Sequence, residues 1–123
     1  MHELGIVFYI VDMVEELGKE NNLSSVTKVN LRLGEVSGVI PDYLQDCWRW
    51  TADRSDLLRG CELAVEEVPA ITVCNTCGRT YPTVEYGKIC PHCSSPDTVL
   101  LQGNEMELDS IEVPEDEVPE GAD

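Results

Sequence analysis

The sequence predicts an α+β protein: two helices on a small three-stranded sheet, with an appended four-cysteine lobe of the zinc-ribbon type. Two observations lead to this prediction. Apolar residues recur with a helical period in two segments and appear as strand-like runs in three others. Two paired-cysteine motifs lie in a stretch that has turn residues and no helical period. The 123 residues are enough for one compact domain with a small insert.

The first segment, residues 1–20, is predicted to be an amphipathic helix, because its apolar residues recur three and four positions apart. These are Ile6, Ile10, Met13, Val14 and Leu17. From residue 26 to 33 the period changes to two, which is typical of a half-buried strand. A glycine-bearing turn, 34–38, follows this strand.

A second helix is predicted to begin at Pro41, where a proline in the first turn costs no hydrogen bond. One face of it carries Leu44, Cys47, Trp48 and Thr51. Gly60 is a plausible stop after it, and residues 61–68 and 105–113 supply the second and third strands. The last strand is expected to return to the first sheet, so that the cysteine-bearing stretch is an excursion from it.

Three regions are therefore expected along the chain. Residues 1–69 form the α+β domain, which the strand within 104–113 completes, and residues 70–103 form the cysteine lobe. Residues 114–123 contain five acids and two prolines and are predicted to be a disordered acidic tail.

The formal net charge of −16, from 24 acidic and 8 basic residues, argues against nucleic acid and against an anionic membrane surface as partners. It is compatible with cations and with basic protein surfaces. No targeting segment and no run of about 18 apolar residues is visible, so a cytoplasmic location is expected. Because thiols stay reduced there, the six cysteines suggest metal binding before disulfides.

Two C-x2-C motifs, twelve residues apart, predict one metal site. Their cysteines are Cys74, Cys77, Cys90 and Cys93. Two such knuckles complete a tetrahedral four-sulfur shell around zinc, and a closed shell leaves no open position for catalysis. Iron in a rubredoxin-like site uses the same geometry, so the residues alone leave the metal open.

The chain begins Met1-His2-Glu3, which can form a second metal site. A free α-amine, the backbone nitrogen of residue 2 and the His2 imidazole can form fused chelate rings around one ion. Such nitrogen-rich, near-planar donor sets suit nickel(II) or copper(II). Glu3 could supply a further donor. A histidine at position 2 also occurs by chance, so this motif alone is weak.

Taken together, these motifs resemble the HypA/HybF family of hydrogenase maturation factors over residues 1 to about 113. The resemblance rests on the paired knuckles and on three further stretches: Met1-His2-Glu3-Leu4, the turn Leu33-Gly34-Glu35-Val36-Ser37-Gly38-Val39, and Gln102-Gly103-Asn104-Glu105-Met106-Glu107-Leu108. Leu4-Gly5 departs from the more hydroxylated helix start expected of the family, and the acidic tail has no family counterpart.

The resemblance implies a nickel metallochaperone that helps insert Ni(II) into the large subunit of [NiFe]-hydrogenase and works with a HypB-like GTPase. In some bacteria such proteins also serve urease maturation. On this resemblance, labile nickel is held at Met1, His2 and Glu3, and structural zinc at the four cysteines.

Three other functions fit the residues less well. An enzyme is disfavoured because the chain has two histidines, no recognisable nucleophile–base pair and no phosphate-binding glycine loop. A nucleic-acid-binding zinc ribbon would need a basic lobe, yet residues 71–101 contain only Arg79 and Lys88 against Glu85 and Asp97. A zinc-stapled acidic adaptor between proteins is the strongest alternative, and it would not bind nickel.

Overall fold

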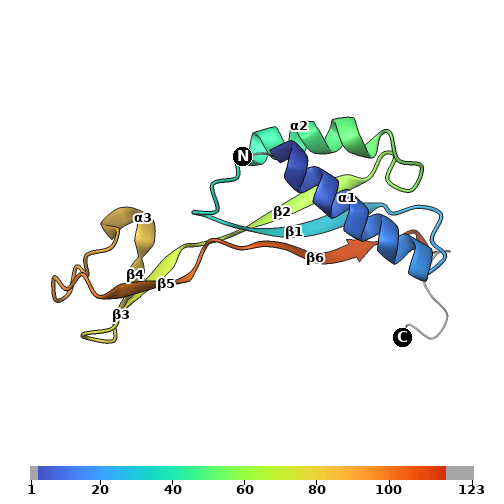
Figure 1. Cartoon of the computed structure of the whole chain (residues 1–123). Helices are drawn as coiled ribbons and strands as arrows, with labels where there is room; N and C mark the ends of the chain where they lie inside the picture. Colours follow the sequence, from blue (N-terminus) through green and yellow to red (C-terminus); the bar gives the residue numbers. More distant parts are fainter. Residues whose placement is uncertain (1–2, 116–123) are drawn as a thin grey trace. The chain divides into compact units, whose positions relative to one another are not determined.

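The computed structural model describes residues 3–115 and confirms the α+β class (Figure 1). Met1, His2 and most of the predicted acidic tail, residues 116–123, lie outside the described residues. The elements in chain order are α1 (Glu3–Glu20), β1 (Lys28–Gly34), α2 (Pro41–Ala52), β2 (Glu62–Val68), β3 (Ile71–Cys74), β4 (Thr80–Pro82), α3 (Thr83–Tyr86), β5 (Thr98–Gln102) and β6 (Met106–Glu112).

The first sheet has the strand order β2-β1-β6, so the last strand returns to it as expected. The Glu62 N–H donates to the Thr27 carbonyl near the start of both β1 and β2, and the Glu35 N–H donates to the Val68 carbonyl at their ends. These two strands therefore run parallel, with α2 as the crossover helix that parallel strands require. Strand β6 is antiparallel to β1, because the Thr27 N–H donates to Glu112 and the Gly34 N–H donates to Glu105.

Both long helices lie on one side of this sheet (Figure 1). Strand β1 buries Val29, Leu31 and Leu33, which confirms the period of two. The buried positions of α1 are Val7, Ile10, Val11, Val14 and Gly18.

The apolar stripe predicted for the first helix is only partly correct. Ile10 and Val14 are in the core, but Ile6, Met13 and Leu17 are half-buried on the flank of the helix. The helix has more apolar residues than one face can hold, so packing against the sheet and α2 decides which stripe turns inward.

The second helix begins at Pro41 as predicted and buries Leu44, Trp48 and Thr51. The Trp48 indole N–H donates to the Cys61 carbonyl at 2.9 Å, which ties the helix to the start of β2. Cys47 was expected on this buried face but is half-buried.

The other face of the sheet is polar. Arg32 lies 3.8 Å from a Glu66 carboxylate oxygen and 3.7 Å from one of Glu107. The Asn30 amide donates to Ser110 and to Glu112. Glu107 and Ser110 reach the same face although they are three residues apart, so the inward–outward alternation of β6 slips between them. This slip explains why residues 105–113 alternate poorly in sequence.

The chain divides into two compact units, and each is described by itself. The first comprises the residues up to Leu31, Val39–Val65 and those from Leu108 onward, and the second comprises Arg32–Gly38 and Glu66–Glu107. The second contains an antiparallel sheet of order β4-β3-β5. Within residues 3–115, no helix has the length and apolar character needed to cross a membrane.

Candidate metal centre

The two cysteine knuckles have the same backbone geometry. In the first, the Gly78 N–H donates to the Cys74 carbonyl at 2.8 Å, and in the second the Ser94 N–H donates to the Cys90 carbonyl at 2.8 Å. The Cys74 and Cys90 N–H groups in turn donate to the carbonyls five residues further on, at 2.9 and 3.0 Å. Each knuckle is therefore a closed turn that brings its two sulfurs to the same side.

Each turn closes through a residue in the left-handed region of backbone conformation. Gly78 has φ +78° and Ser94 has φ +64°. Glycine adopts this conformation without steric cost, so Gly78 fits a turn signal in the sequence. Ser94 was not anticipated, because a non-glycine residue rarely has positive φ.

Polar side chains connect the two knuckles, and none of them was identified from the sequence. The Asn75 N–H donates to the Asp97 carbonyl at 2.9 Å, and its side-chain amide donates to the Asp97 carboxylate at 3.1 Å. The hydroxyl groups of Thr76 and Ser95 are 2.8 Å apart. These bonds hold the two turns in register, so the four sulfurs converge.

The four Sγ atoms of Cys74, Cys77, Cys90 and Cys93 all lie within 4.8 Å of one another. The Cys74 and Cys93 sulfurs are 3.5 Å apart, and those of Cys77 and Cys90 are 3.7 Å apart. A tetrahedron with metal–sulfur bonds of about 2.3 Å has edges of about 3.8 Å, so the spacing fits one tetrahedral ion. In the described part of the chain, no other group of three or more histidines, cysteines or carboxylates converges in this way.

The lobe has very little apolar core apart from these cysteines. Its buried cluster consists of Cys74, Tyr81 and Cys90, so two of its three members are candidate metal ligands. The Tyr81 hydroxyl donates to the Gly87 carbonyl at 2.9 Å, and its ring packs edge-on against Tyr86. A core of this size buries too little surface to fold alone, which is the usual reason for a structural metal.

The acidities of two cysteines in the cluster are pushed in opposite directions. The backbone N–H of Cys77 is the largest influence that lowers the pKa of the Cys74 thiol to about 6. For Cys93, the Ser95 N–H lowers the pKa, but the neighbouring sulfur of Cys74 and burial outweigh it and raise the pKa to about 12. Adjacent thiolates repel each other, so only a bound cation allows all four sulfurs to be deprotonated together.

Of the predicted nickel ligands, only Glu3 lies within the described residues. It is the first residue of α1, and its carboxylate accepts a hydrogen bond from the Ile40 N–H at 3.0 Å. Ile40 precedes the first turn of α2 and has no side-chain cap of its own. The Glu3 carboxylate therefore ties the start of one helix to the start of the other.

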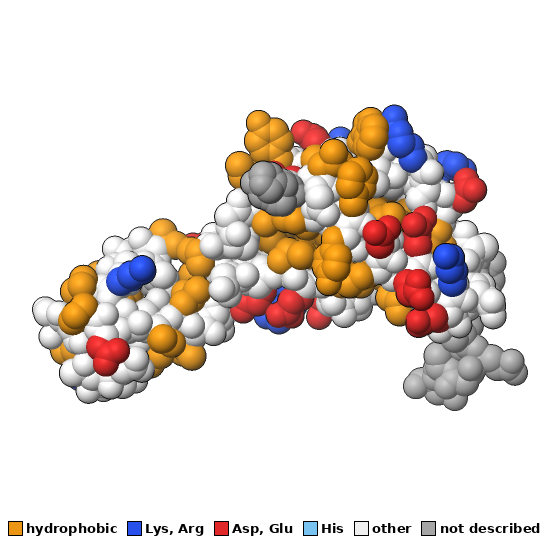
Figure 2. All heavy atoms as spheres, in the orientation of Figure 1, with side chains coloured by type: hydrophobic (Ala, Val, Ile, Leu, Met, Phe, Trp, Pro, Cys, Tyr) orange, Lys and Arg blue, Asp and Glu red, His pale blue; other side chains and the backbone are white. Residues whose placement is uncertain are grey.

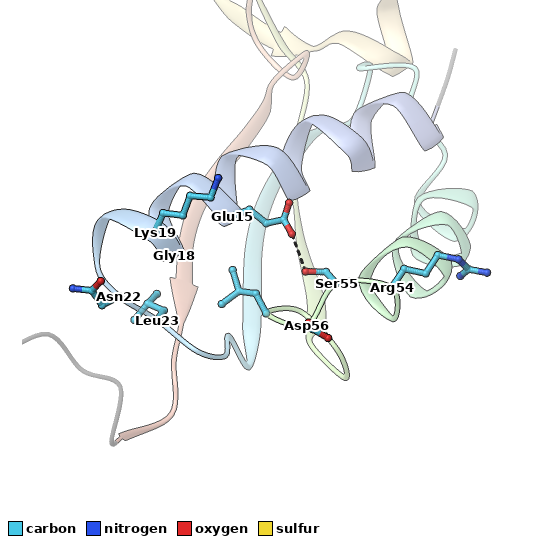
Figure 3. A pocket seen from close by; sticks show the side chains of 9 residues that line it. Glu15, Gly18, Lys19, Asn22, Leu23, Arg54, Ser55 and Asp56 are labelled. Carbon is cyan, nitrogen blue, oxygen red and sulfur yellow. Dashed lines mark hydrogen bonds between the residues drawn. The ribbon is translucent and has the colours of Figure 1, made fainter.

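A hollow at the other end of α1 has no comparable donor set (Figure 3). Glu15 accepts a hydrogen bond from the Ser55 hydroxyl across it, at 3.0 Å. The Arg54 side chain points away from the hollow and lies 3.8 Å from the centre of the Trp50 ring. Because the Glu15 carboxylate and the Ser55 hydroxyl are already bonded to each other, this hollow is not a candidate for the metal site.

The fold and the cluster define a small α+β metal-binding protein in which four cysteines surround one metal position. Comparison with known proteins gives the family. Residues 1–113 match the family model described as "Hydrogenase/urease nickel incorporation, metallochaperone, hypA". The chain belongs to the HypA family of hydrogenase maturation factors.

Individual relatives agree with this family. The chain is 38% identical over 122 residues to the hydrogenase maturation factor HypA of Roseiflexus sp. (strain RS-1), covering 98% of this chain and 97% of the relative. It is 33% identical to HypA of Chlorobaculum parvum, covering 92% and 99%. The solution structure of the Ni metallochaperone HypA from Helicobacter pylori has the same fold, with a TM-score of 0.67, 24% identity and coverage of 92% of this chain and 97% of that one.

Proposed function

We propose that this protein is a non-catalytic nickel-delivery factor that carries Ni(II) for maturation of [NiFe]-hydrogenase. Zinc is held permanently by Cys74, Cys77, Cys90 and Cys93, and nickel is held reversibly by Met1, His2 and Glu3. The observation that carries the proposal is the match of residues 1–113 to a family described by nickel incorporation. That description also names urease, so urease maturation is a second possible destination for the nickel.

The chemistry of the two donor sets supports a division of labour. A closed shell of four thiolates holds zinc tightly and leaves no position for exchange. A set of nitrogen donors at the chain start suits nickel(II), and its ligands can be passed one by one to a receiving site. The Glu3 contact with Ile40 supports this arrangement, because it fixes the residue that follows His2.

The proposed partners are a HypB-like GTPase and the hydrogenase large subunit, and the proposed location is the cytoplasm. The name shared by the relatives, hydrogenase maturation factor, supports the hydrogenase as destination. A zinc-stapled adaptor without nickel transfer is the alternative. It is favoured by the net charge of −16, which suits contact with basic proteins.

Metal analysis of the His2→Ala protein separates these functions. We expect this variant to lose nickel and to keep one zinc per chain, because only the imidazole has been removed. The matched control is His92→Ala, which removes the chain's other histidine, an exposed residue between two zinc ligands. It should keep both metals. Equal nickel uptake by His2→Ala and the unmodified protein would contradict nickel carriage at this site.

A second variant tests the role of the chain start without changing any side chain. One residue added before Met1 displaces the α-amine from the His2 chelate, so nickel affinity should fall while zinc content stays the same. Equilibrium dialysis against Ni²⁺ measures this directly. Unchanged affinity would leave the adaptor as the better explanation.

A further inference from the structure

An apolar groove runs along α1 on the side of β6. Tyr9, Met13 and Leu17 repeat every four residues on the helix flank, and Leu108 of β6 lies opposite them. Leu17 continues the groove to Leu23, Ile111 and Val113. We call this surface the α1–β6 groove. Tyr9 is 55% exposed, and the other members are half-buried, so their apolar surface is only partly covered by the fold.

The rim of the α1–β6 groove is acidic. Asp12, Glu16 and Glu20 line it, again four residues apart, and all three are exposed. Figure 2 shows hydrophobic side chains gathered over α1 and beside it, with acidic side chains next to them. A row of like charges at this spacing weakens the isolated helix, so charge repulsion is relieved when basic groups bind there.

One side of the groove is formed by β6, an outer strand of its sheet. Strand β6 is at the edge of the β2-β1-β6 sheet. The Glu112 carbonyl accepts from the Thr27 N–H and so points toward β1. Because neighbouring residues in a strand direct their backbone groups to opposite sides, Ile111 directs its groups away from β1. Ile111, whose side chain lines the groove, therefore also turns its backbone groups toward the side where a strand could be added.

We propose that the α1–β6 groove binds an extended segment of a partner protein whose every second residue is either apolar or basic (lysine or arginine), so that both kinds share the strand face that turns to α1. Such a segment adds a strand beside β6 by β-augmentation, which gives affinity through main-chain hydrogen bonds. Its apolar side chains face Met13, Leu17 and Ile111, and its basic residues lie near Asp12, Glu16 and Glu20. This surface involves neither of the two metal sites.

Charge favours this occupant over a second copy of the chain. Each copy has a formal net charge of −16, and pairing two β6 edges would bring two acidic rims together. Charged side chains on an edge strand are a common protection against self-pairing. A basic partner is attracted by the acidic rim, whereas a second copy of the chain is repelled by it.

Binding of a fluorescein-labelled nine-residue peptide, in which lysine and valine take turns at the odd-numbered positions and threonine fills the even-numbered ones, tests the proposal on the zinc-loaded full chain. We expect a dissociation constant below about 100 µM by fluorescence anisotropy. Replacing its lysines with glutamate should abolish binding. Methylating the peptide's backbone nitrogens on one edge should also weaken binding at least about tenfold, because a strand without those N–H groups cannot extend the sheet.

Two charge-reversal variants locate the peptide. Asp12→Lys/Glu16→Lys/Glu20→Lys should lose at least about tenfold in affinity. The control Asp46→Lys/Asp53→Lys/Asp56→Lys changes the net charge equally at exposed positions that do not line the groove and should bind as before. Amide shifts in the bound state should centre on Ile111 and the α1 flank.

Three outcomes would overturn the proposal. Equal loss in both triple variants would show attraction to the overall charge only. Unchanged binding of the methylated peptide would exclude strand addition. Sedimentation showing a dimer that the α1 triple variant strengthens would make a second copy the occupant.

Discussion

Cys61 and Cys74 show how one side-chain type acquires opposite acidities in two environments. Burial, and secondarily the charge of Glu62, raises the pKa of the Cys61 thiol to about 11. The backbone N–H of Cys77 lowers that of Cys74 to about 6. Both side chains are buried. The difference is that the turn of a knuckle directs N–H groups at the sulfur, and a thiolate accepts those bonds better than a thiol does.

The Cys61 pKa predicts a loss of stability in alkali. The unfolded chain releases this proton near the ordinary value of 9.0, whereas the folded chain keeps it to about 11. The contribution is therefore complete below pH 9 and is lost as pH rises through 11. Between about pH 8 and about pH 10.5, the urea midpoint of unfolding should drop less for Cys61→Ala than for the unmodified protein. The first pH lies below the unfolded pKa of the thiol and the second lies above it. An identical drop would show that Cys61 does not titrate in this range.

Substitution within the cluster predicts loss of the metal. Cys77→Ser should lower zinc affinity by at least about 100-fold, because a hydroxyl does not replace a thiolate as a zinc ligand. Cys47→Ser, which changes a half-buried cysteine outside the cluster, is the matched control and should retain zinc. Competition with a chromophoric chelator measures both. Retention of zinc at unchanged affinity by Cys77→Ser would exclude this sulfur as a ligand.

At the scale of elements, three segments meet closely where the cysteine lobe begins. A Cβ atom on Gly34 would be 2.0 Å from the Gly103 carbonyl oxygen, and one on Gly103 would be 2.4 Å from the Ala70 Cα. The Val36 N–H donates to the Gly103 carbonyl, and the Ala70 N–H donates to the Glu35 carboxylate. This crossing has room for backbone only, so its glycines are required by close approach.

The crossing predicts different results for two glycine-to-alanine substitutions. Gly34→Ala should lower the free energy of unfolding by at least about 2 kcal/mol, because backbone atoms would have to move. Gly18→Ala meets only the movable end of the Leu57 side chain, at 2.8 Å, and alanine favours a helix. We expect that variant to change the free energy by less than about 1 kcal/mol. Urea unfolding, followed by circular dichroism, measures the free energy of unfolding of both variants. Equal losses for Gly34→Ala and Gly18→Ala would contradict the close backbone approach at Gly34.

At the scale of the whole molecule, the two compact units differ in what stabilises them. The first has a core of buried aliphatic residues contributed by α1, α2 and β1. The lobe in the second depends on a cluster of Cys74, Tyr81 and Cys90. We therefore expect metal binding at the four cysteines to be coupled to folding of the lobe.

Zinc removal should consequently unfold the lobe and spare the first unit. With excess chelator, the amide signals of β3, β4 and β5 should lose their dispersion, because two of the three residues in their buried cluster, Cys74 and Cys90, are candidate metal ligands. Trp48 and Trp50 both lie in the first unit, so tryptophan emission should stay unchanged. A red shift of that emission on zinc removal would show that the metal stabilises both units.

Short-range patterns made much of this structure predictable. The strand at β1 follows from alternation over seven residues, and α2 follows from Pro41 and the spacing of Leu44 and Trp48. The cysteine cluster was predictable because each knuckle is a turn of a few residues, and its ligand types leave few alternatives. Long-range features were not: the slip in β6 depends on its partner strand, and Ser94 adopts positive φ only because the knuckle closes around it.

The sequence by itself determined the class of fold, the order of the main elements and the set of four cysteines that cluster, since these depend on residues close together in the chain. Tertiary structure alone decided which stripe of α1 turned inward, and so left Met13 and Leu17 on the wall of a groove. It also decided that Glu3 would meet Ile40, 37 residues away. Contacts of this kind depend on how whole elements pack, and no local pattern encodes that packing.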